Sequence, residues 1–179
     1  MKTIQKIAII GNCGSGKSTL APRLHTIFNL PVYHLDHYYW KPGWIEREPT
    51  EYEVIHKGLC DKDEWIIDGM NMRVLEYRIQ KADTIIVLDI PRFICVYRII
   101  KRTLKYYGTV RPLGPHGCPE RFDWEFIKFL KWVVINFKKK NYPAKINEFL
   151  VKHGAGKQIY ILKSQQEIDS FLKEIKRIQ

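Results

Sequence analysis

The stretch IAIIGNCGSGKSTLAPRL, residues 7–24, decides how this chain folds. An apolar run over residues 7–10 leads into GNCGSGKST, residues 11–19, which is the complete phosphate-loop pattern in its strand–loop–helix context. The glycines let the backbone turn tightly, so that successive N–H groups point at one anion, and the N-terminus of the helix adds positive potential. The stretch therefore predicts a strand, a loop that binds nucleotide phosphates, and a helix.

Several residues of this loop have an expected task. Lys17 is the predicted catalytic lysine, which reaches the β- and γ-phosphates, and the hydroxyl of Ser18 is a predicted ligand for Mg²⁺. Cys13 contributes its backbone, because the geometry of the loop matters more there than the thiol. The residues expected to bind ATP through this loop are Gly11, Cys13, Gly14, Ser15, Gly16, Lys17, Ser18 and Thr19.

Strands and helices alternate along the whole chain. Apolar runs predict strands at residues 4–10, 32–35, 65–68, 84–89 and 158–162. Helical patterns and caps predict helices at residues 16–28, 51–59, 71–81, 91–107, 123–140, 143–153 and 165–178. This alternation predicts one α/β domain, residues 1–179, in which a five-stranded parallel sheet lies between two layers of helices. Residues 37–64, irregular around one short helix, are the expected acceptor-binding insertion, and the Pro- and Gly-rich residues 108–122 are the expected lid.

Three aspartates end predicted strands, at the edge of the sheet where ligands bind in such folds. Asp36 is the expected catalytic residue that activates the acceptor hydroxyl or holds metal or substrate beside it; otherwise it is a turn residue or a partner of Lys41. Asp68 is either a water-mediated metal contact or part of a tight Asp-Gly turn. Asp89 ends the run TIIVLD and either holds a Mg²⁺-bound water or caps the helix that Pro91 opens.

Arginines are the expected partners of the transferred phosphoryl group, because their planar paired donors match its equatorial oxygens. Arg98 and Arg102 stand four residues apart and so share a helix face, while Arg111 and Arg121 flank the predicted lid. We expect Arg98, Arg102 and Arg111 to act in catalysis. The alternative is that they form a solvated surface; Arg73 is a further candidate on the acceptor side.

Aromatic residues surround Asp36 in the segment HLDHYYWKPGW, residues 34–44. They either wall an acceptor pocket, with ring faces for a cyclic group and polar tips for hydroxyls, or form a small core beneath a long loop.

A net charge of +11, from 30 basic and 19 acidic residues, favours anionic partners but does not choose among them. The basic and aromatic residues 126–140 suggest a nucleic-acid surface; the competing interpretation is an amphipathic core helix, and a membrane-surface helix ranks last. The early apolar run is broken by the phosphate loop, and the apolar runs are too short to span a bilayer. These features predict a cytoplasmic protein without a membrane partner.

The motifs GNCGSGKSTLA, HLDHYYWKPGW, WIIDGMN, DTIIVLDIPR, YRIIKR and GCPE resemble the topology-modulation protein family, which are small adenylate-kinase-like P-loop proteins. The resemblance implies a sheet order of 2-3-1-4-5, binding of ATP and Mg²⁺, kinase activity, and a position near the adenine for Lys163 and Ser164. The chain departs from the family at DGMN, where DGN followed by tyrosine is more frequent, which affects the role of Asn71.

The sequence as a whole predicts ATP- and Mg²⁺-dependent phosphoryl transfer to a small-molecule or nucleotide acceptor. The alternative is an ATP-switched regulator that binds nucleic acid and affects DNA topology. The acceptor and the oligomeric state do not follow from these patterns.

Overall fold

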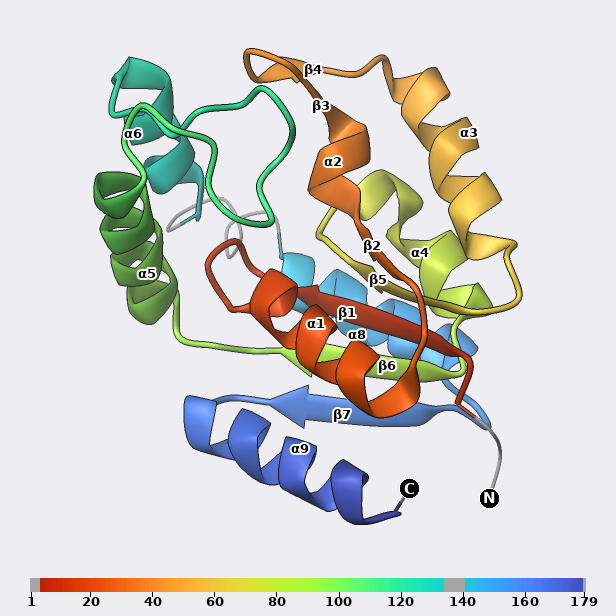
Figure 1. Ribbon diagram of the computed structural model, residues 1–179. Helices are drawn as coiled ribbons and strands as arrows, with labels where there is room; N and C mark the ends of the chain where they lie inside the picture. The colour runs from red at the N-terminus through yellow and green to blue at the C-terminus, as the bar shows by residue number, and fades with distance from the viewer. Residues whose placement is uncertain (1–3, 134–140, 179) are drawn as a thin grey trace.

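The computed structural model describes residues 4–133 and 141–178, which are built around a five-stranded parallel sheet (Figure 1). Its strands are β1 Lys6–Gly11, β2 Val32–His34, β5 Trp65–Asp68, β6 Thr84–Leu88 and β7 Gln158–Leu162. The spatial order is β2-β5-β1-β6-β7, and every neighbouring pair is parallel. Numbered along the chain, the five strands of this sheet therefore lie in the expected order 2-3-1-4-5.

The register of the central strands determines where the phosphate loop begins relative to the ends of the neighbouring strands. Ile9 of β1 lies opposite Asp68, the last residue of β5, and Gly11 lies opposite Leu88, the last residue of β6. The branched apolar residues of β1, β5 and β6 are buried on both faces, which is usual for a covered parallel sheet. The loop after β1 thus emerges at the same edge as the ends of its two neighbours.

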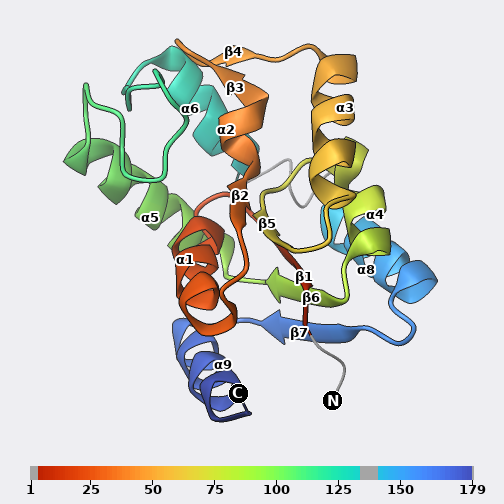
Figure 2. The same ribbon diagram turned by 45° about the vertical axis from the view of Figure 1, so that its right-hand side comes forward.

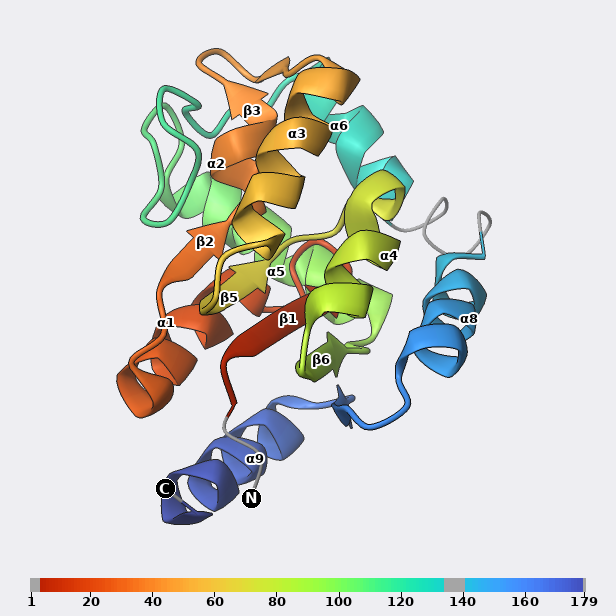
Figure 3. The same ribbon diagram turned by 90° about the vertical axis from the view of Figure 1, so that its right-hand side faces the viewer.

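Helices form a layer on each side of the sheet (Figure 3). One layer is α1 Lys17–Phe28 and α9 Gln165–Ile178, whose apolar faces pack on Ile7, Ile9 and Ile86. The other layer is α3 Pro49–Cys60, α4 Met72–Lys81 and α8 Tyr142–His153, which pack on Ala8, Ile10 and Ile67. Alternate residues of β1 therefore face opposite helical layers, and the predicted three-layer architecture is confirmed.

Two further helices stand beyond the carboxyl edge of the sheet, toward which the strand arrows point in Figure 1. They are α5 Arg92–Lys105 and α6 Trp124–Lys131, and they share a small core made by Ile99, Phe126 and Val133. The predicted helix over residues 123–140 is seen as α6, while residues 134–140 lie outside the described part of the chain. Within that described part, no helix is both long and apolar enough to cross a bilayer.

The segment between β2 and β5 is more regular than the sequence indicated. It contains a short helix, α2 Leu35–Tyr39, and a two-stranded antiparallel hairpin of β3 Trp40–Lys41 and β4 Ile45–Glu46 ahead of α3. The strand that was expected to reach residue 35 ends one residue earlier, so Asp36 lies in the first turn of a helix. The side chain of the buried Leu35 packs against Gly69, where an added Cβ would lie 2.7 Å from it, so β2 and β5 meet closely at this edge.

Candidate active site

The phosphate loop lies directly against α5. Gly14 has a φ of 78°, and a Cβ added there would lie 2.4 Å from the carbonyl oxygen of Cys95. Gly16 has a φ of 103°, and a Cβ added there would meet the Nη1 atom of Arg98 at 3.6 Å. Glycine is thus required at Gly14 both by the left-handed backbone and by the close approach of the neighbouring helix.

The loop has the donor set that a triphosphate needs. The Nζ atom of Lys17 donates to the carbonyl oxygen of Asn12 at 2.9 Å, which holds the buried amine inside the loop. The hydroxyl of Ser15 is buried and has no hydrogen-bond partner among the residues that the structure describes. Gly16 caps α1 without a side-chain bond, so the first amides of the helix remain available to an anion. These residues therefore fit the phosphates of a nucleotide.

Asp68 forms a buried ion pair at the end of β5. Its Oδ1 atom accepts a hydrogen bond of 2.8 Å from Nδ1 of His34, and both side chains are almost fully buried. Burial alone would raise the pKa of Asp68, but the hydrogen bonds from His34 and Ser18 and the nearby Lys17 hold it below its usual value. The carboxylate is thus ionised and linked to the hydroxyl expected to bind Mg²⁺.

The sequence did not indicate that His34 would be the partner of Asp68. Burial alone would lower the pKa of the imidazole, but Asp68 and, more weakly, Asp36 raise it. The glycine after Asp68 also has a left-handed φ of 141°, so the carboxylate and the tight turn coexist at this strand end.

In the described part of the chain, no three acidic, histidine or cysteine side chains gather into a metal site by themselves. A magnesium ion here would need phosphate oxygens and water as further ligands.

Asp89 is exposed beyond the end of β6, where its backbone N–H donates to the carbonyl oxygen of Leu162 at 2.9 Å. The helix that follows is capped at Pro91 without a side-chain hydrogen bond. Asp89 therefore does not occupy the N-cap position of this helix. Its role toward a metal-bound water stays a prediction.

Arg98 and Arg102 share a face of α5 but contact different segments. Arg98 donates to the carbonyl oxygen of Ser15 and to Oε1 of Gln165, both at 3.1 Å, and so bridges the phosphate loop to α9. Arg102 turns toward the predicted lid, residues 108–122, where its Nε atom lies 3.4 Å from Oε1 of Glu120. Each arginine thus has a specific partner, which argues against a purely solvated helix face.

Glu120 organises the base of the lid, and only its membership of the GCPE motif pointed to it in the sequence. Its carboxylate is 4% exposed and accepts hydrogen bonds from Arg111 Nη1 at 2.6 Å and from the hydroxyl of Thr103 at 2.7 Å. Arg111 in turn lies 3.8 Å from Oδ2 of Asp36, whose side chain is half exposed. A lid arginine is therefore placed beside the carboxylate predicted to serve the acceptor.

Cys13 marks the point where the predicted catalytic residues converge. Burial raises the pKa of its thiol, while Lys17, Arg102 and Arg111 lower it and Asp36 raises it further. Charged groups of the phosphate loop, α2, α5 and the predicted lid thus all act on the thiol of Cys13. Ion pairs join α2 and α5 to the predicted lid, because Arg111 lies 3.8 Å from Asp36 and Arg102 lies 3.4 Å from Glu120.

Other candidates have local structural partners instead. The hydroxyl of Ser164 accepts from the N–H of Glu167 at 3.1 Å, and Glu167 accepts from the N–H of Lys163 at 2.8 Å, so both residues belong to the cap of α9. The side chain of Asn71 caps α4 by accepting from the N–H of the exposed Arg73. Arg121, at the end of the lid, pairs at 3.0 Å with Asp123, the residue that caps α6.

The aromatic residues around Asp36 pack mainly on one another. The rings of Tyr39 and Tyr52 meet edge to face at 5.2 Å, and those of Trp40 and Trp44 at 5.5 Å. Burial and a hydrogen bond with Glu46 raise the pKa of Tyr39 to about 12, so its hydroxyl stays protonated. This arrangement favours the small-core interpretation for these rings, with Trp44 extending toward the lid.

Comparisons with known proteins agree on the fold. No protein-family model matches the chain, and neither does any curated protein, so the topology-modulation resemblance stays a prediction. Among solved structures, a shikimate kinase from Acinetobacter baumannii in complex with shikimate is 13% identical with a TM-score of 0.61, over 99% of this chain and 93% of that one. A shikimate kinase from Bacteroides thetaiotaomicron is 12% identical with a TM-score of 0.56, over 98% of each chain.

A gluconokinase from Sinorhizobium meliloti is similar over 99% of this chain and 92% of its own, with 10% identity and a TM-score of 0.52. At such identities the similarity concerns the fold alone. The chain thus has the fold of P-loop small-molecule kinases.

Proposed function

We propose that the protein is a kinase that uses ATP and Mg²⁺ to phosphorylate a hydroxyl group of a small-molecule or nucleotide acceptor. The observation that carries this proposal is a pair of side chains at the carboxyl edge of the sheet, where the phosphate loop emerges: Arg111 of the expected lid lies 3.8 Å from Oδ2 of Asp36 of α2. A nucleotide-binding loop alone would also fit a regulatory protein that changes conformation when ATP binds. A half-exposed carboxylate paired with an arginine of the expected lid supplies the additional parts that phosphoryl transfer requires.

The nucleotide half of the site would be held by the phosphate loop. Lys17 and the first amides of α1 would hold the phosphates, and Ser18 and Asp68 would hold Mg²⁺, with Asp89 as a second candidate through water. Bound Mg²⁺ would neutralise charge that develops between the β- and γ-phosphates. The protein side chains then have two tasks, which are to orient the acceptor and to stabilise charge on the transferred group.

The acceptor half of the site would be formed around Asp36. Its carboxylate would accept the proton of the acceptor hydroxyl, because it is half exposed and close to the phosphate loop. Arg102 and Arg111 would stabilise the transferring phosphoryl group, while Arg98 fixes the loop from α5. Lys163 and Ser164 would lie near the adenine, in addition to capping α9.

The nucleic-acid alternative has less structural support. Of the residues 126–140 that suggested it, the described part contributes Phe126 and Val133 to a buried cluster with Ile99. This matches the amphipathic core helix that competed with the nucleic-acid surface. A cytoplasmic location remains our proposal, in keeping with a kinase of small metabolites.

The proposal is tested in two steps. Calorimetry should detect binding of ATP in saturating Mg²⁺; no heat from ATP or GTP would remove the kinase interpretation. A panel of shikimate, other small hydroxy acids, nucleosides and nucleoside monophosphates should then contain a compound that stimulates ADP release. If ATP binds and no member of a broad panel stimulates release, an ATP-dependent switch becomes the better interpretation.

A further inference from the structure

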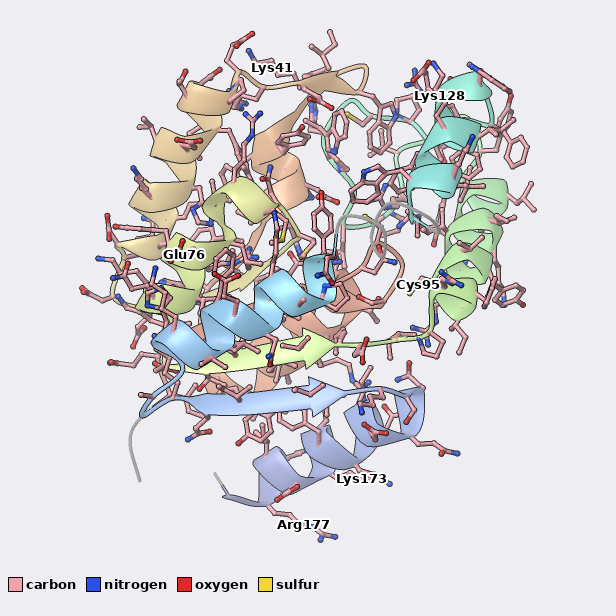
Figure 4. All side chains as sticks on the ribbon, turned by 180° about the vertical axis from the view of Figure 1, so that it is seen from behind. Lys41, Glu76, Cys95, Lys128, Lys173 and Arg177 are labelled. Atoms are coloured by element: carbon pink, nitrogen blue, oxygen red, sulfur yellow. The ribbon has the colours of Figure 1, made fainter. Side chains whose placement is uncertain are left out.

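The β3–β4 hairpin, residues 40–46, is tied to the lid loop, residues 108–122, although more than 60 residues separate them in sequence. The two segments lie side by side in Figures 1 and 2. In Figure 4 Lys41 of the hairpin and Lys128 of α6 lie at the same end of the molecule. Three hydrogen bonds join the segments: Gly43 N–H to Gly117 O at 2.8 Å, Cys118 Sγ to Lys41 O at 3.3 Å, and Trp44 Nε1 to Pro119 O at 2.7 Å.

Trp44 makes the contact that reaches a proposed catalytic residue. The guanidinium carbon of Arg111 lies 6.0 Å from the centre of its ring, within the range of a cation–π contact. The indole N–H meanwhile holds the backbone of the lid at Pro119. One side chain of the acceptor-side insertion therefore supports both the main chain of the lid and its arginine.

The backbone of Trp44 is itself unusual. Its φ is 63°, a left-handed conformation that bulky residues seldom adopt, and Leu113 in the lid loop has a φ of 60°. Such conformations persist where the surroundings hold them, and they cluster at functional sites. Both outliers lie in the two segments that contact each other. Trp44 lies in the turn between β3 and β4, directly after Gly43, whose φ is 80°. The turn of the hairpin therefore fixes the backbone from which the indole contacts the lid.

We propose that Trp44 is a positioning residue that couples the acceptor side of the site to the lid, by fixing Arg111 next to Asp36. The inference rests on the proposed kinase function for its catalytic consequence, but not for its structural content. Arg111 is held by Glu120 within the lid, by Asp36 on α2 and by Trp44 on the hairpin. Hairpin and lid then open and close as one unit, so acceptor entry and lid opening are one event.

The test compares two substitutions at this position with a matched control. Trp44→Phe keeps an aromatic face for Arg111 but removes the N–H donor, and Trp44→Leu removes both. Trp124→Leu is the control, because that tryptophan is 67% exposed on α6. The first readout is hydrogen exchange at the amides of Gly108 and Glu120, which hydrogen-bond across the base of the lid. The second is ATP affinity by calorimetry, and the third is kcat and KM with an acceptor from the panel.

We expect lid exchange to rise about tenfold in Trp44→Leu and less in Trp44→Phe, because a hydrogen bond and a cation–π contact oppose local opening. Trp124→Leu should exchange like the unsubstituted protein. The affinity for ATP should change less than about threefold, while kcat falls about tenfold or more, because the substitution displaces Arg111 and leaves the phosphate loop intact.

The outcomes separate the two proposals. If the unsubstituted protein binds no ATP, the kinase proposal fails, while lid exchange still decides whether Trp44 holds the lid. If Trp44→Leu leaves lid exchange unchanged, the inference is overturned, whatever the activity. It is also overturned if exchange rises but kcat does not fall, or if ATP affinity falls as much as kcat. Should Trp44→Leu fail to fold, Trp44→Phe carries the same test through the lost N–H donor.

Discussion

The phosphate loop and the lid loop face the same site but are held in different ways. The phosphate loop is contiguous in sequence, emerges between buried strands, and is held by α5 at its back. The lid loop is held by a few separate contacts. Its own Glu120 accepts from Thr103 of α5 and from Arg111. The hairpin donates to the loop from the N–H of Gly43 and from the indole of Trp44. The difference teaches that the proposed nucleotide half is built from neighbouring elements, whereas the proposed acceptor half depends on a few long-range contacts.

Among the proposed substitutions, Lys17→Ala should reduce activity the most. A small effect would contradict the division of the site into a nucleotide half and an acceptor half. Loss of the buried amine removes a charge-stabilising contact, so we expect phosphoryl transfer to fall by about 10²–10³-fold and ATP binding to weaken. ADP release with an acceptor from the panel, together with calorimetry, measures both effects. Arg23→Ala is the matched control, because it removes a cation from the same helix at a half-exposed ion pair with Asp169. Normal turnover in Lys17→Ala would mean that the loop is not the active site.

Asp36→Asn tests the acceptor half in the same way. The amide keeps the shape of the side chain but cannot accept a proton, so kcat should fall by about 10²-fold, at the lower end of general-base effects. ATP affinity should remain within a few-fold of the original value, because the side chain lies on α2 rather than in the phosphate loop. Parallel losses of kcat and ATP affinity would instead assign Asp36 to a metal-binding or structural role.

The strand, loop and helix of the proposed nucleotide half could be predicted from sequence because the information for them is local. Nine consecutive residues specify the phosphate loop, and the strand at residues 65–68 and the helix at residues 165–178 have the predicted bounds. Each of these elements carries its own periodicity or cap. The resemblance to a known family supplied the order of the strands, which local patterns do not contain.

The acceptor half escaped prediction because its contacts are not local. Strands of two residues, such as β3 and β4, show no alternation to detect. The pair of His34 and Asp68 joins residues that are 34 positions apart, and the bond from Trp44 to Pro119 spans 75. Burial of the Glu120 carboxylate likewise depends on how the lid packs. Only the assembled fold shows which charged residues meet.

A pair of glycines extends the comparison from the phosphate loop to the hairpin that contacts the lid loop. Gly14 and Gly43 both have left-handed φ values, of 78° and 80°, but an added Cβ meets the Cys95 carbonyl oxygen at 2.4 Å in the first case and nothing within 4 Å in the second. Gly14→Ala should therefore weaken ATP binding by about tenfold or more, since strain and a backbone clash act together. Gly43→Ala should cost about 1 kcal/mol of stability from strain alone. Calorimetry measures the ATP affinity of both variants, and thermal unfolding measures their stability. Equal ATP affinities would mean that the close contact between the phosphate loop and α5 does not control binding.

The helix α3 that supports the acceptor side should make the protein sensitive to acid. Burial, with a smaller contribution from Arg78, lowers the pKa of His56 to about 3, whereas its ordinary value is 6.5. Between these values the unfolded chain binds a proton that the folded chain does not, so stability is lost as pH falls from 6.5 toward 3. His56→Gln should reduce the slope of unfolding free energy against pH by at most about 1.4 kcal/mol per pH unit.

Urea unfolding at several pH values between 4 and 7 measures that slope. His116→Gln, at an exposed position in the lid loop, provides the control substitution. The description of α3 as anchored by a neutral, buried histidine would be wrong if His56→Gln kept the full slope of the unsubstituted protein.

The smallest expected effect distinguishes two roles of Ser164. Its hydroxyl accepts the N–H of Glu167 and so caps α9, which packs on the same face of the sheet as α1. Ser164→Ala should therefore lower stability by about 1 kcal/mol, the usual cost of losing a helix cap. If this is its whole role, calorimetry will find ATP affinity unchanged, while Ser164→Asp, which also caps, will restore stability. A clear loss of ATP affinity in Ser164→Ala, with stability restored but affinity not restored in Ser164→Asp, would place the hydroxyl at the adenine and extend the rigid nucleotide half as far as α9.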